Sequence, residues 1–329
     1  MKRLTVVGGG AWGTALAIAA ARGGSLPVIW ARDPSVVTAI NERRENPVYL
    51  PAVRLDSVIA ARHDLGAALA EAEAVLLAVP AQSLRGVLVA IAAHLRVGTP
   101  LLHCAKGIEA GSLATMSEIG REILPASPFA VLSGPSFAAE IARGLPAAVT
   151  IASHDGALAR AFTAALASDK FRPYLSDDPI SAEIGGSVKN VLAIACGMIL
   201  GRGYGDNARA ALITRGLAEM IRLGVAKGGR AETFAGLSGI GDLVLTCSAV
   251  QSRNFALGLA LGRGATLADA LAGRHTTVEG VTTAAAVVGL ARRLGIEMPI
   301  SEAVETVLHH GVSIDAMADR LLRRPHRAE

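Results

Sequence analysis

The sequence predicts an α/β domain with a doubly wound parallel sheet, followed by an all-α domain. Two observations lead to this prediction. In the first half, short apolar runs alternate with helical stretches, the pattern of parallel strands buried on both faces. After about residue 180, helix follows helix, with glycine turns between them and no convincing strand. We therefore expect one domain over 1–180 and a second over 181–329, in line with the length of 329 residues.

Six apolar runs are the candidate strands of the first domain, and each is short and rich in Val, Ile, Leu or Ala. They are residues 4–8, 26–30, 74–79, 99–105, 129–134 and 147–153. The alanine-rich stretch 14–22 is the first expected helix. Strands separated by helices connect in parallel, which places helices on both faces of the sheet.

Composition excludes several classes of protein. Apolar residues make up 51% of the chain and charged residues 18%, which excludes a disordered chain and predicts a large core. The net charge of +4 is small, and no basic stretch is interleaved with aromatic residues, so we expect no nucleic-acid partner. The three cysteines are far apart and lack metal-ligand spacing. They indicate reduced thiols, no metal site and a cytoplasmic protein.

The N-terminus could be mistaken for a secretory signal, because Lys2 and Arg3 precede an apolar stretch. Glycines at 8, 9, 10 and 13 interrupt that stretch where a signal needs a continuous helix. No later segment reaches the roughly 18 uninterrupted apolar residues of a membrane span. We expect neither a signal peptide nor a membrane span.

The first run leads directly into GGGAWG, which supplies Gly8, Gly10 and Gly13 in G-x-G-x-x-G spacing before a helix. In a Rossmann-type domain the first glycine permits the tight turn and the second lets the backbone approach a pyrophosphate. The third lets the helix pack on the strand, and N–H groups at the helix start face the phosphates. A plain glycine turn is the alternative, but the position in the first strand–helix turn favours a dinucleotide site.

The second run ends at Trp30 and is followed by Arg32 and Asp33. An acid at this place binds the ribose 2′-hydroxyl of NAD, whereas a base accommodates the 2′-phosphate of NADP. Arg32 lies nearer the end of the strand, so the sequence favours NADP slightly. The alternative is that both residues only begin a solvated turn before Pro34.

A helix is expected over 182–200, with an apolar stripe at helical spacing made of Ile184, Val188, Val191, Ala195 and Ile199. Around Lys189, the residues at helical spacing are small and uncharged: Gly185, Gly186, Ala193 and Cys196. A lysine in such surroundings is expected to be half-buried, and desolvation suits a lysine to general acid or base catalysis. A lysine that extends to water is an equally good interpretation of this pattern.

Two further segments carry cations that could bind a phosphorylated substrate. Lys106 follows the run 99–105 at its carboxyl end, where open α/β sheets bind ligands. Arg253 and Asn254 lie in QSRN, after a glycine-rich turn. Taken singly, each is more often a surface residue.

Together these segments resemble the bacterial type of NAD(P)-dependent glycerol-3-phosphate dehydrogenases. The resemblance extends over nearly the whole chain in the right order. It comprises GGGAWGTALA (8–17), AVP (78–80), AKGIE (105–109), SGPSFAAE (133–140), GGSVKNVLAIACG (185–197), GYGDNARAALITRGLAEM (203–220), GIGDLVLTC (239–247), QSRN (251–254) and VEG (278–280).

The resemblance implies a helical second domain like that of 6-phosphogluconate dehydrogenases, and catalysis between the two domains. It implies Lys189 as the catalytic proton acceptor in the oxidation direction. It implies a substrate site made of Lys106, Gly134, Ser136, Lys189, Asn190, Asp242, Thr246, Ser252, Arg253 and Asn254. It implies an NAD(P) site made of Gly8, Gly10, Ala11, Trp12, Gly13, Arg32, Lys106, Ala138, Arg253 and Glu279. Ala11 is a departure, because many bacterial members carry serine there, so one hydroxyl contact to the cofactor phosphates is missing.

The expected function is reversible hydride transfer between NAD(P)H and dihydroxyacetone phosphate, giving sn-glycerol 3-phosphate for glycerophospholipid synthesis. One alternative is a reductase of the same two-domain plan for another small hydroxy or keto substrate, such as ketopantoate. Another is a nicotinamide-binding sensor without turnover. The presence of Lys106 and Lys189 argues against this alternative. The expected partner is a small-molecule substrate. A homodimer is compatible with the sequence, which leaves the choice of NAD or NADP, the regulation and the direction of flux open.

Overall fold

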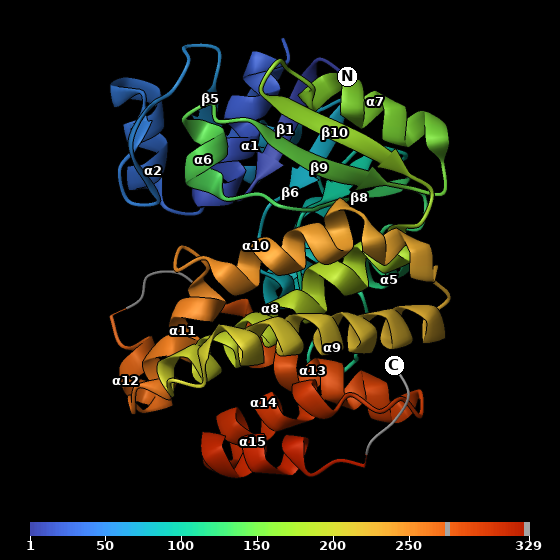
Figure 1. Ribbon diagram of the computed structural model, residues 1–329. Coiled ribbons are helices and arrows are strands. Elements are labelled where there is room, and N and C mark those ends of the chain that lie inside the picture. Colours follow the sequence, from blue (N-terminus) through green and yellow to red (C-terminus); the bar gives the residue numbers. More distant parts are fainter. Residues whose placement is uncertain (274–276, 326–329) are drawn as a thin grey trace. The chain divides into compact units, whose positions relative to one another are not determined.

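The computed structural model describes residues 1–273 and 277–325 and forms two compact units (Figure 1). Unit 1 comprises Met1–Lys106 and Ala114–Glu183, and unit 2 comprises Gly107–Leu113 and Ile184–Glu329. The expected boundary at residue 180 lies close to the last passage of the chain between the units, after Glu183. The segment 107–113, expected in the first domain, belongs to unit 2.

An eight-stranded sheet forms the centre of unit 1, in the order β10-β9-β8-β7-β6-β1-β2-β5. Its strands are β1 (Arg3–Val7), β2 (Leu26–Trp30), β5 (Ala60–Arg62), β6 (Ala74–Leu77), β7 (Leu101–His103), β8 (Phe129–Ser133), β9 (Ala147–Ala152) and β10 (Phe171–Ser176). β2 and β6 flank β1 on opposite sides, so the order of strands reverses at β1, the switch point at which such sheets bind ligands.

The sheet departs from the expected one in its direction and in its number of strands. β8 and β9 pair antiparallel, whereas all other neighbours in this sheet are parallel. Apolar runs identify buried strands but not their direction, and the β8–β9 connection contains only the short helix α6 (Ala138–Ala142). β5 and β10, and the antiparallel pair β3 (Glu45–Asn46) and β4 (Leu50–Arg54), were not expected.

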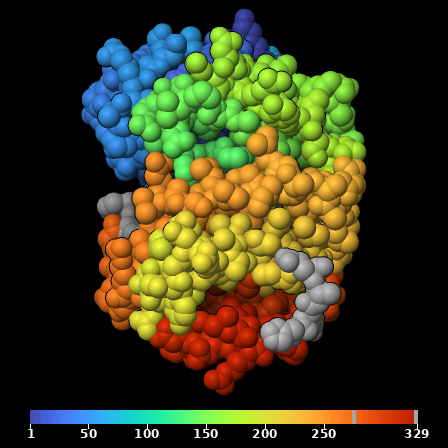
Figure 2. All heavy atoms as spheres, in the orientation of Figure 1, coloured from blue at the N-terminus to red at the C-terminus, as the bar shows by residue number. Residues whose placement is uncertain are grey.

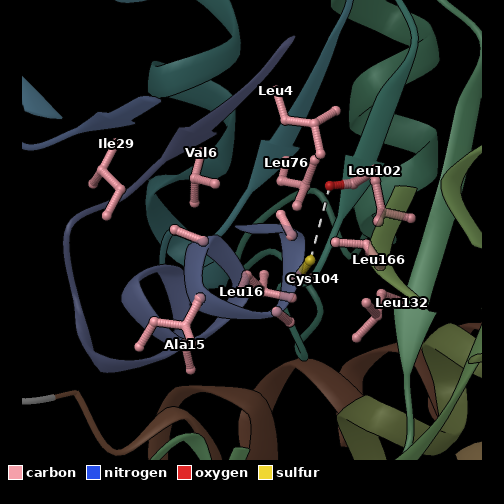
Figure 3. Packing of buried hydrophobic residues seen from close by; sticks show 14 of the residues in the cluster. Leu4, Val6, Ala15, Leu16, Ile29, Leu76, Leu102, Cys104, Leu132 and Leu166 are labelled. Atoms are coloured by element: carbon pink, nitrogen blue, oxygen red, sulfur yellow. Dashed lines mark hydrogen bonds between the residues drawn. The ribbon is translucent and has the colours of Figure 1, made fainter. Parts of the chain in front are cut away.

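Helices cover both faces of the sheet and produce two cores. They are α1 (Ala11–Arg22), α2 (Pro34–Thr38), η1 (Ala39–Arg43), α3 (Leu65–Leu69), η2 (Ala81–Ser83), α4 (Leu84–Ala92), α5 (Met116–Ile123), α6 and α7 (Gly156–Leu166). Leu4 and Val6 of β1 pack with α1 in one core, part of which Figure 3 shows. Val7 packs with α4 and α5 in the other. This two-sided burial is the basis of the doubly wound arrangement.

All regular secondary structure of unit 2 in the residues that the structure describes is helical. Its helices are α8 (Pro179–Gly201), which begins in unit 1, α9 (Gly205–Ala226), η3 (Ala231–Ala235), η4 (Leu237–Gly241), α10 (Asp242–Ser248), α11 (Arg253–Gly262), α12 (Leu267–Leu271), α13 (Glu279–Arg293), α14 (Pro299–His310) and α15 (Ile314–Leu322). Figure 2 shows much of α9, in yellow, at the surface. α8, in contrast, is buried on all sides from Ser181 to Met198.

By length and composition, α8 is apolar enough to cross a membrane, with 23 residues and a mean hydropathy of 1.5 in its most apolar window. Within the structure, however, 83% of that window is buried. A helix that is apolar all round is also what the core of a large domain requires. The burial identifies α8 as a core helix, and the expected single apolar stripe was too narrow a description of it.

Close backbone contact joins α8 to α11. A Cβ added at Gly197 of α8 would lie 2.2 Å from the carbonyl oxygen of Phe255, and one at Gly258 of α11 would lie 2.1 Å from that of Ile194. A Cβ at Gly201 or Gly262, one turn further along each helix, would also be too close, at 2.6 and 2.3 Å from its nearest atom. Only glycine permits this approach, which holds the start of α11 close to the middle of α8.

A buried polar cluster lies in unit 1 next to the places where the chain passes between the units. His103 ends β7, and its Nε2 lies 3.0 Å from Glu183 Oε1 and 3.2 Å from Ser117 Oγ. The backbone N–H of Ser117 donates to the same carboxylate oxygen at 2.8 Å. The chain passes between the units after Lys106, Leu113 and Glu183. The cluster therefore connects the three segments of unit 1 that adjoin these passages.

Candidate active site

The turn from β1 to α1 has the crowding that a dinucleotide loop requires. Gly8 has φ of +124°, which favours glycine, and a Cβ there would lie 2.5 Å from the carbonyl oxygen of Ala78. A Cβ at Gly13 would lie 1.9 Å from the carbonyl oxygen of Gly8, so helix and loop are in direct contact. A Cβ at Gly10, in contrast, would have no atom within 4 Å. The fold therefore explains Gly8 and Gly13, and open space beside Gly10 fits the approach of a pyrophosphate.

The start of α1 offers backbone donors to that space. Gly10 is its N-cap residue, and no side chain caps the helix there. Ala11 and Trp12 occupy the first turn and are half-buried, so their positions fit the cofactor roles that the resemblance implies. An uncapped helix N-terminus carries partial positive charge and unpaired N–H groups, which favour a bound phosphate.

Asn46 supports the loop and was not identified from the sequence. Its Nδ2 donates to the carbonyl oxygen of Gly9 at 2.9 Å and to Thr14 Oγ1 at 2.8 Å, and its side chain is fully buried. It belongs to β3, a two-residue strand without any apolar pattern. Nothing in the sequence around Asn46 indicates that it reaches the glycine loop.

Arg32 and Asp33, which follow β2, differ in their contacts and therefore in their roles. Asp33 is the N-cap of α2 and accepts a hydrogen bond from the backbone N–H of Ser35 at 2.8 Å. Hydrogen bonds from Ser35 lower the pKa of the Asp33 carboxyl, so this acid is ionised and already has a structural role. Arg32 is exposed, which leaves its guanidinium accessible to a ligand.

Three residues of unit 1 that the resemblance implies lie together. Lys106 Nζ donates to the carbonyl oxygen of Gly134 at 2.9 Å and to Ser136 Oγ at 3.2 Å. Ser136 Oγ also donates to that carbonyl oxygen at 2.8 Å. Gly134 has φ of +124°, and Ala138 is the first residue of α6. These contacts place the ammonium group beside the loop that follows β8.

In unit 2, Lys189 lies in the middle of α8 and is buried, so it does not extend to water. Its Nζ donates to Asp242 Oδ1 at 2.5 Å and to Thr246 Oγ1 at 2.9 Å. Asp242 and Thr246 are one turn apart on α10 and are also buried. Breaking such a buried pair usually costs about 3–5 kcal/mol, so the three side chains form a closely coupled unit.

The crowding of α8 explains how Asp242 reaches Lys189. A Cβ at Gly185, one turn before Lys189, would lie 2.3 Å from the carbonyl oxygen of Ser238 in η4. This contact brings η4 against α8, and Asp242 follows η4 directly as the first residue of α10. The small residues that the sequence shows around Lys189 are therefore packing contacts that allow an acid to approach.

Asn190 and Asn254 form a second polar group beside Lys189. Asn254 Nδ2 donates to Asn190 Oδ1 at 2.9 Å, and Asn254 Oδ1 accepts from the backbone N–H of Gly280 at 2.9 Å. Ser252 is the N-cap of α11 and accepts from the N–H of Phe255. Arg253 is exposed at the same helix start.

Glu279 is the first residue of α13, and among the described residues no group of three or more His, Cys, Asp or Glu could hold a metal ion. Cys247 lies on α10 next to Thr246 and is buried, and burial raises its pKa well above the ordinary value. A neutral thiol there adds no charge to the Lys189–Asp242 pair.

The polar groups can therefore perform two separate tasks. Lys189 offers a proton-carrying group oriented by a carboxylate and a hydroxyl, which is what a general acid or base requires. The amides of Asn190 and Asn254, with Arg253, offer hydrogen-bond donors suited to an oxygen-rich anion. The residues of unit 1 offer a dinucleotide loop and the ammonium of Lys106.

Two family models together match most of the chain. The sequence model of the NAD-dependent glycerol-3-phosphate dehydrogenase N-terminus matches residues 3–159, and that of the C-terminus matches residues 178–319. A glycerol-3-phosphate dehydrogenase [NAD(P)+] of Caulobacter vibrioides is 54% identical over 328 residues, covering 100% of this chain and 99% of the relative. One of Rhodospirillum rubrum is 55% identical over 326 residues, covering 99% of this chain and 93% of the relative.

Solved structures agree with the sequences. The crystal structure of glycerol-3-phosphate dehydrogenase from Coxiella burnetii has a TM-score of 0.94 and 38% identity, covering 98% of this chain and 99% of that one. A ketopantoate reductase from Ralstonia eutropha has a TM-score of 0.58 at 18% identity. The second likeness shows a shared fold alone.

Proposed function

Because the chain belongs to the NAD-dependent glycerol-3-phosphate dehydrogenase family, we propose that it interconverts dihydroxyacetone phosphate and sn-glycerol 3-phosphate with NAD(P)H. The observation that supports this most directly is the buried Lys189–Asp242–Thr246 group. The product is a precursor of glycerophospholipids, so we propose that the enzyme supplies their synthesis. Its three cysteines are free and buried, as expected for a reducing compartment such as the cytoplasm.

The cofactor would be held by the β1–α1 turn, where Gly8, Gly10 and Gly13 leave room for the diphosphate and the first turn of α1 presents N–H groups. The nicotinamide, when bound, supplies or accepts the hydride. We propose that Arg32 binds the 2′-phosphate of NADP, because Arg32 is exposed while Asp33 caps α2. An enzyme with these features would prefer NADPH.

Lys189 is the proposed general acid and base. In carbonyl reduction its ammonium donates a proton to the substrate oxygen as negative charge develops there, and in oxidation the neutral amine accepts that proton. Asp242 and Thr246 each accept a hydrogen bond from Nζ. They orient the ammonium group, because two of its three N–H bonds are directed at oxygens of α10, and these two determine the direction of the third.

The phosphate of the substrate is the proposed ligand of the start of α11. Ser252, Arg253 and Asn254 lie there, and a guanidinium provides two parallel hydrogen bonds to a phosphate. Asn190 is proposed to hold the substrate near Lys189, and Lys106, Gly134 and Ser136 to contribute from unit 1. Arg253, Ala138 and Glu279 are the remaining proposed cofactor contacts.

The proton role is tested by Lys189→Met, which removes the ammonium but keeps a side chain of similar length. We expect wild-type affinity for NADPH in a fluorescence titration and a kcat lower by about two to four orders of magnitude. Lys170→Met, at an exposed lysine of unit 1, is the matched control and should be fully active. A Lys189→Met enzyme with near-normal kcat would contradict the assignment.

The phosphate role is tested by Arg253→Leu, with Arg263→Leu at the other end of α11 as the control. Arg253→Leu should raise the KM for dihydroxyacetone phosphate steeply and hardly change the low activity on unphosphorylated dihydroxyacetone. The measurement is kcat/KM for both substrates. An unchanged ratio between them would show that Arg253 does not bind the phosphate.

Two alternatives are separated by a single set of assays. A reductase for another substrate would oxidise NADPH with ketopantoate or a keto acid faster than with dihydroxyacetone phosphate. A sensor would bind NADPH without oxidising it in the presence of any of them. Sedimentation of the purified chain would decide whether it is a homodimer, the assembly with which the sequence is compatible.

A further inference from the structure

Helix α13 begins without a cap of its own. Its N-cap residue is Val278, which provides no side-chain hydrogen bond. The N–H of Gly280, the second residue of the helix, has no acceptor within the first turn of a helix. It donates instead to Asn254 Oδ1 of α11 at 2.9 Å. A side chain from another helix therefore performs the capping that Val278 cannot.

This hydrogen bond determines the orientation of two amides. A backbone N–H can only donate, so the atom of Asn254 that faces Gly280 must be its oxygen. The other atom, Nδ2, then faces Asn190 and donates to its Oδ1 at 2.9 Å. Asn190 Nδ2 in turn faces the carbonyl oxygen of Gly186, at 3.3 Å. Each end of this chain of amides is a backbone group whose polarity cannot change.

The space beside Gly280 is also restricted. A Cβ there would lie 2.7 Å from Asn254 Oδ1, 2.7 Å from Ile194 Cδ1 and 2.8 Å from the carbonyl oxygen of Asn190. The first and last of these atoms belong to the two amide-bearing residues themselves. A side chain at position 280 would therefore push directly on both asparagines.

We propose that Gly280 is a positioning residue for substrate binding, a role that rests on the proposed function of Asn190 and Asn254. Its N–H selects the orientation of the Asn254 amide and, through it, that of Asn190. Its lack of a side chain lets the three helices α8, α11 and α13 meet. The start of α13 carries partial positive charge, which polarises the side-chain carbonyl of Asn254. This polarisation makes the Nδ2 group of Asn254 a better hydrogen-bond donor. An anionic substrate is the class that this direction of hydrogen bonding favours.

The contact itself is tested without any assay of activity. Amide hydrogen exchange of Gly280 should be slow in the wild type, because Asn254 binds its N–H, although second residues of helices normally exchange rapidly. In Asn254→Ala the rate should rise by about tenfold or more. Rapid exchange of Gly280 in the wild-type protein would overturn the proposal, and so would equal rates in the two proteins.

The role in substrate binding is tested by Gly280→Ala. Gly289→Ala is the matched control, because it makes the same change in the same helix and its Cβ would meet only the flexible end of Leu113, at 3.2 Å. Gly280→Ala should raise the KM for dihydroxyacetone phosphate by about tenfold or more, which corresponds to roughly 1.4 kcal/mol of binding. The NADPH dissociation constant should stay within about twofold of the wild-type value. Gly289→Ala should change neither.

A wild-type KM in Gly280→Ala would overturn the proposal. So would a loss of NADPH affinity as large as the rise in KM, since that indicates a disturbance that is not specific to substrate binding. If Gly280→Ala does not fold, the exchange of Gly280 in the wild type and in Asn254→Ala decides. A wild-type enzyme that does not reduce dihydroxyacetone phosphate would refute the proposed function, while the exchange experiment would still test the chain of amides.

Discussion

Alanine substitutions at Gly10 and Gly13 should separate cofactor binding from folding within one loop. At Gly10 the new Cβ would have no neighbour within 4 Å, and the backbone, with φ −76° and ψ −177°, is one that alanine adopts without strain. Gly10→Ala should therefore melt at the wild-type temperature or slightly above it. Replacing glycine by alanine at a compatible site stabilises by about 0.4–1 kcal/mol through the unfolded chain.

Gly13→Ala should behave in the opposite way. Its Cβ would lie 1.9 Å from the carbonyl oxygen of Gly8, whereas such contacts below 3.0 Å essentially do not occur. The start of α1 must therefore move by more than about 1 Å, and overpacking of this kind costs about 1–3 kcal/mol. At roughly 2–4 °C per kcal/mol, the melting temperature should fall by roughly 2–12 °C.

Gly10→Ala should also weaken the binding of NADPH. In Gly10→Ala the methyl group occupies the space through which the backbone approaches the diphosphate, so the dissociation constant should rise by about tenfold or more. Thermal melts without cofactor and fluorescence titrations with NADPH measure the two effects. The reasoning is refuted if Gly10→Ala binds NADPH as tightly as the wild type, or if it loses as much stability as Gly13→Ala.

Three further outcomes are expected. Arg32→Ala should raise the KM for NADPH much more than that for NADH, and an equal effect would remove the basis for a preference for NADP. Burial raises the pKa of Cys104 to about 12, so this thiol should resist alkylation at about pH 8 until the protein unfolds, and rapid labelling of the native protein would contradict its burial. Burial also raises the pKa of Glu219, which accepts hydrogen bonds from Ile300 and Ser301 at the start of α14. A raised folded-state pKa contributes stability below the unfolded value of about 4.5 that is lost as the pH rises through the folded value. The free energy of unfolding should therefore fall with rising pH more steeply in the wild type than in Glu219→Gln, and parallel profiles would argue against this.

The sequence predicts the elements that are apolar on both faces and misses those that are not. All six expected strands are present, because a central strand must be apolar throughout. β10 was missed because it alternates, with Arg172 exposed and Phe171 buried, and contains Pro173, which argues against a central strand. β5 has only three residues, too few for a period to be recognised.

The candidate site shows a similar division. The glycine spacing and the small residues around Lys189 are local features, so the sequence alone suggests them. The partner of Lys189 is not local, since Asp242 lies 53 residues away, and only the family resemblance pointed to it. Gly280 belongs to the VEG segment of the resemblance, but the sequence suggests no role for it, because the chain contains 36 glycines and the contact that distinguishes this one exists only between helices.

The three passages of the chain between the units also have a consequence for synthesis on the ribosome. Residues 107–113 emerge early, yet in unit 2 they contact α13, where Arg293 donates hydrogen bonds to the carbonyl oxygens of Ser112 and Leu113 at 3.2 and 3.4 Å. That partner is made some 180 residues later. Glu183, which completes the cluster with His103 and Ser117, is the last residue of unit 1 to emerge. The first unit must therefore fold before α13, which the seven-residue segment Gly107–Leu113 contacts, has been synthesised. No single cut yields both units whole, and a fragment that ends at residue 180 would lack Glu183 altogether.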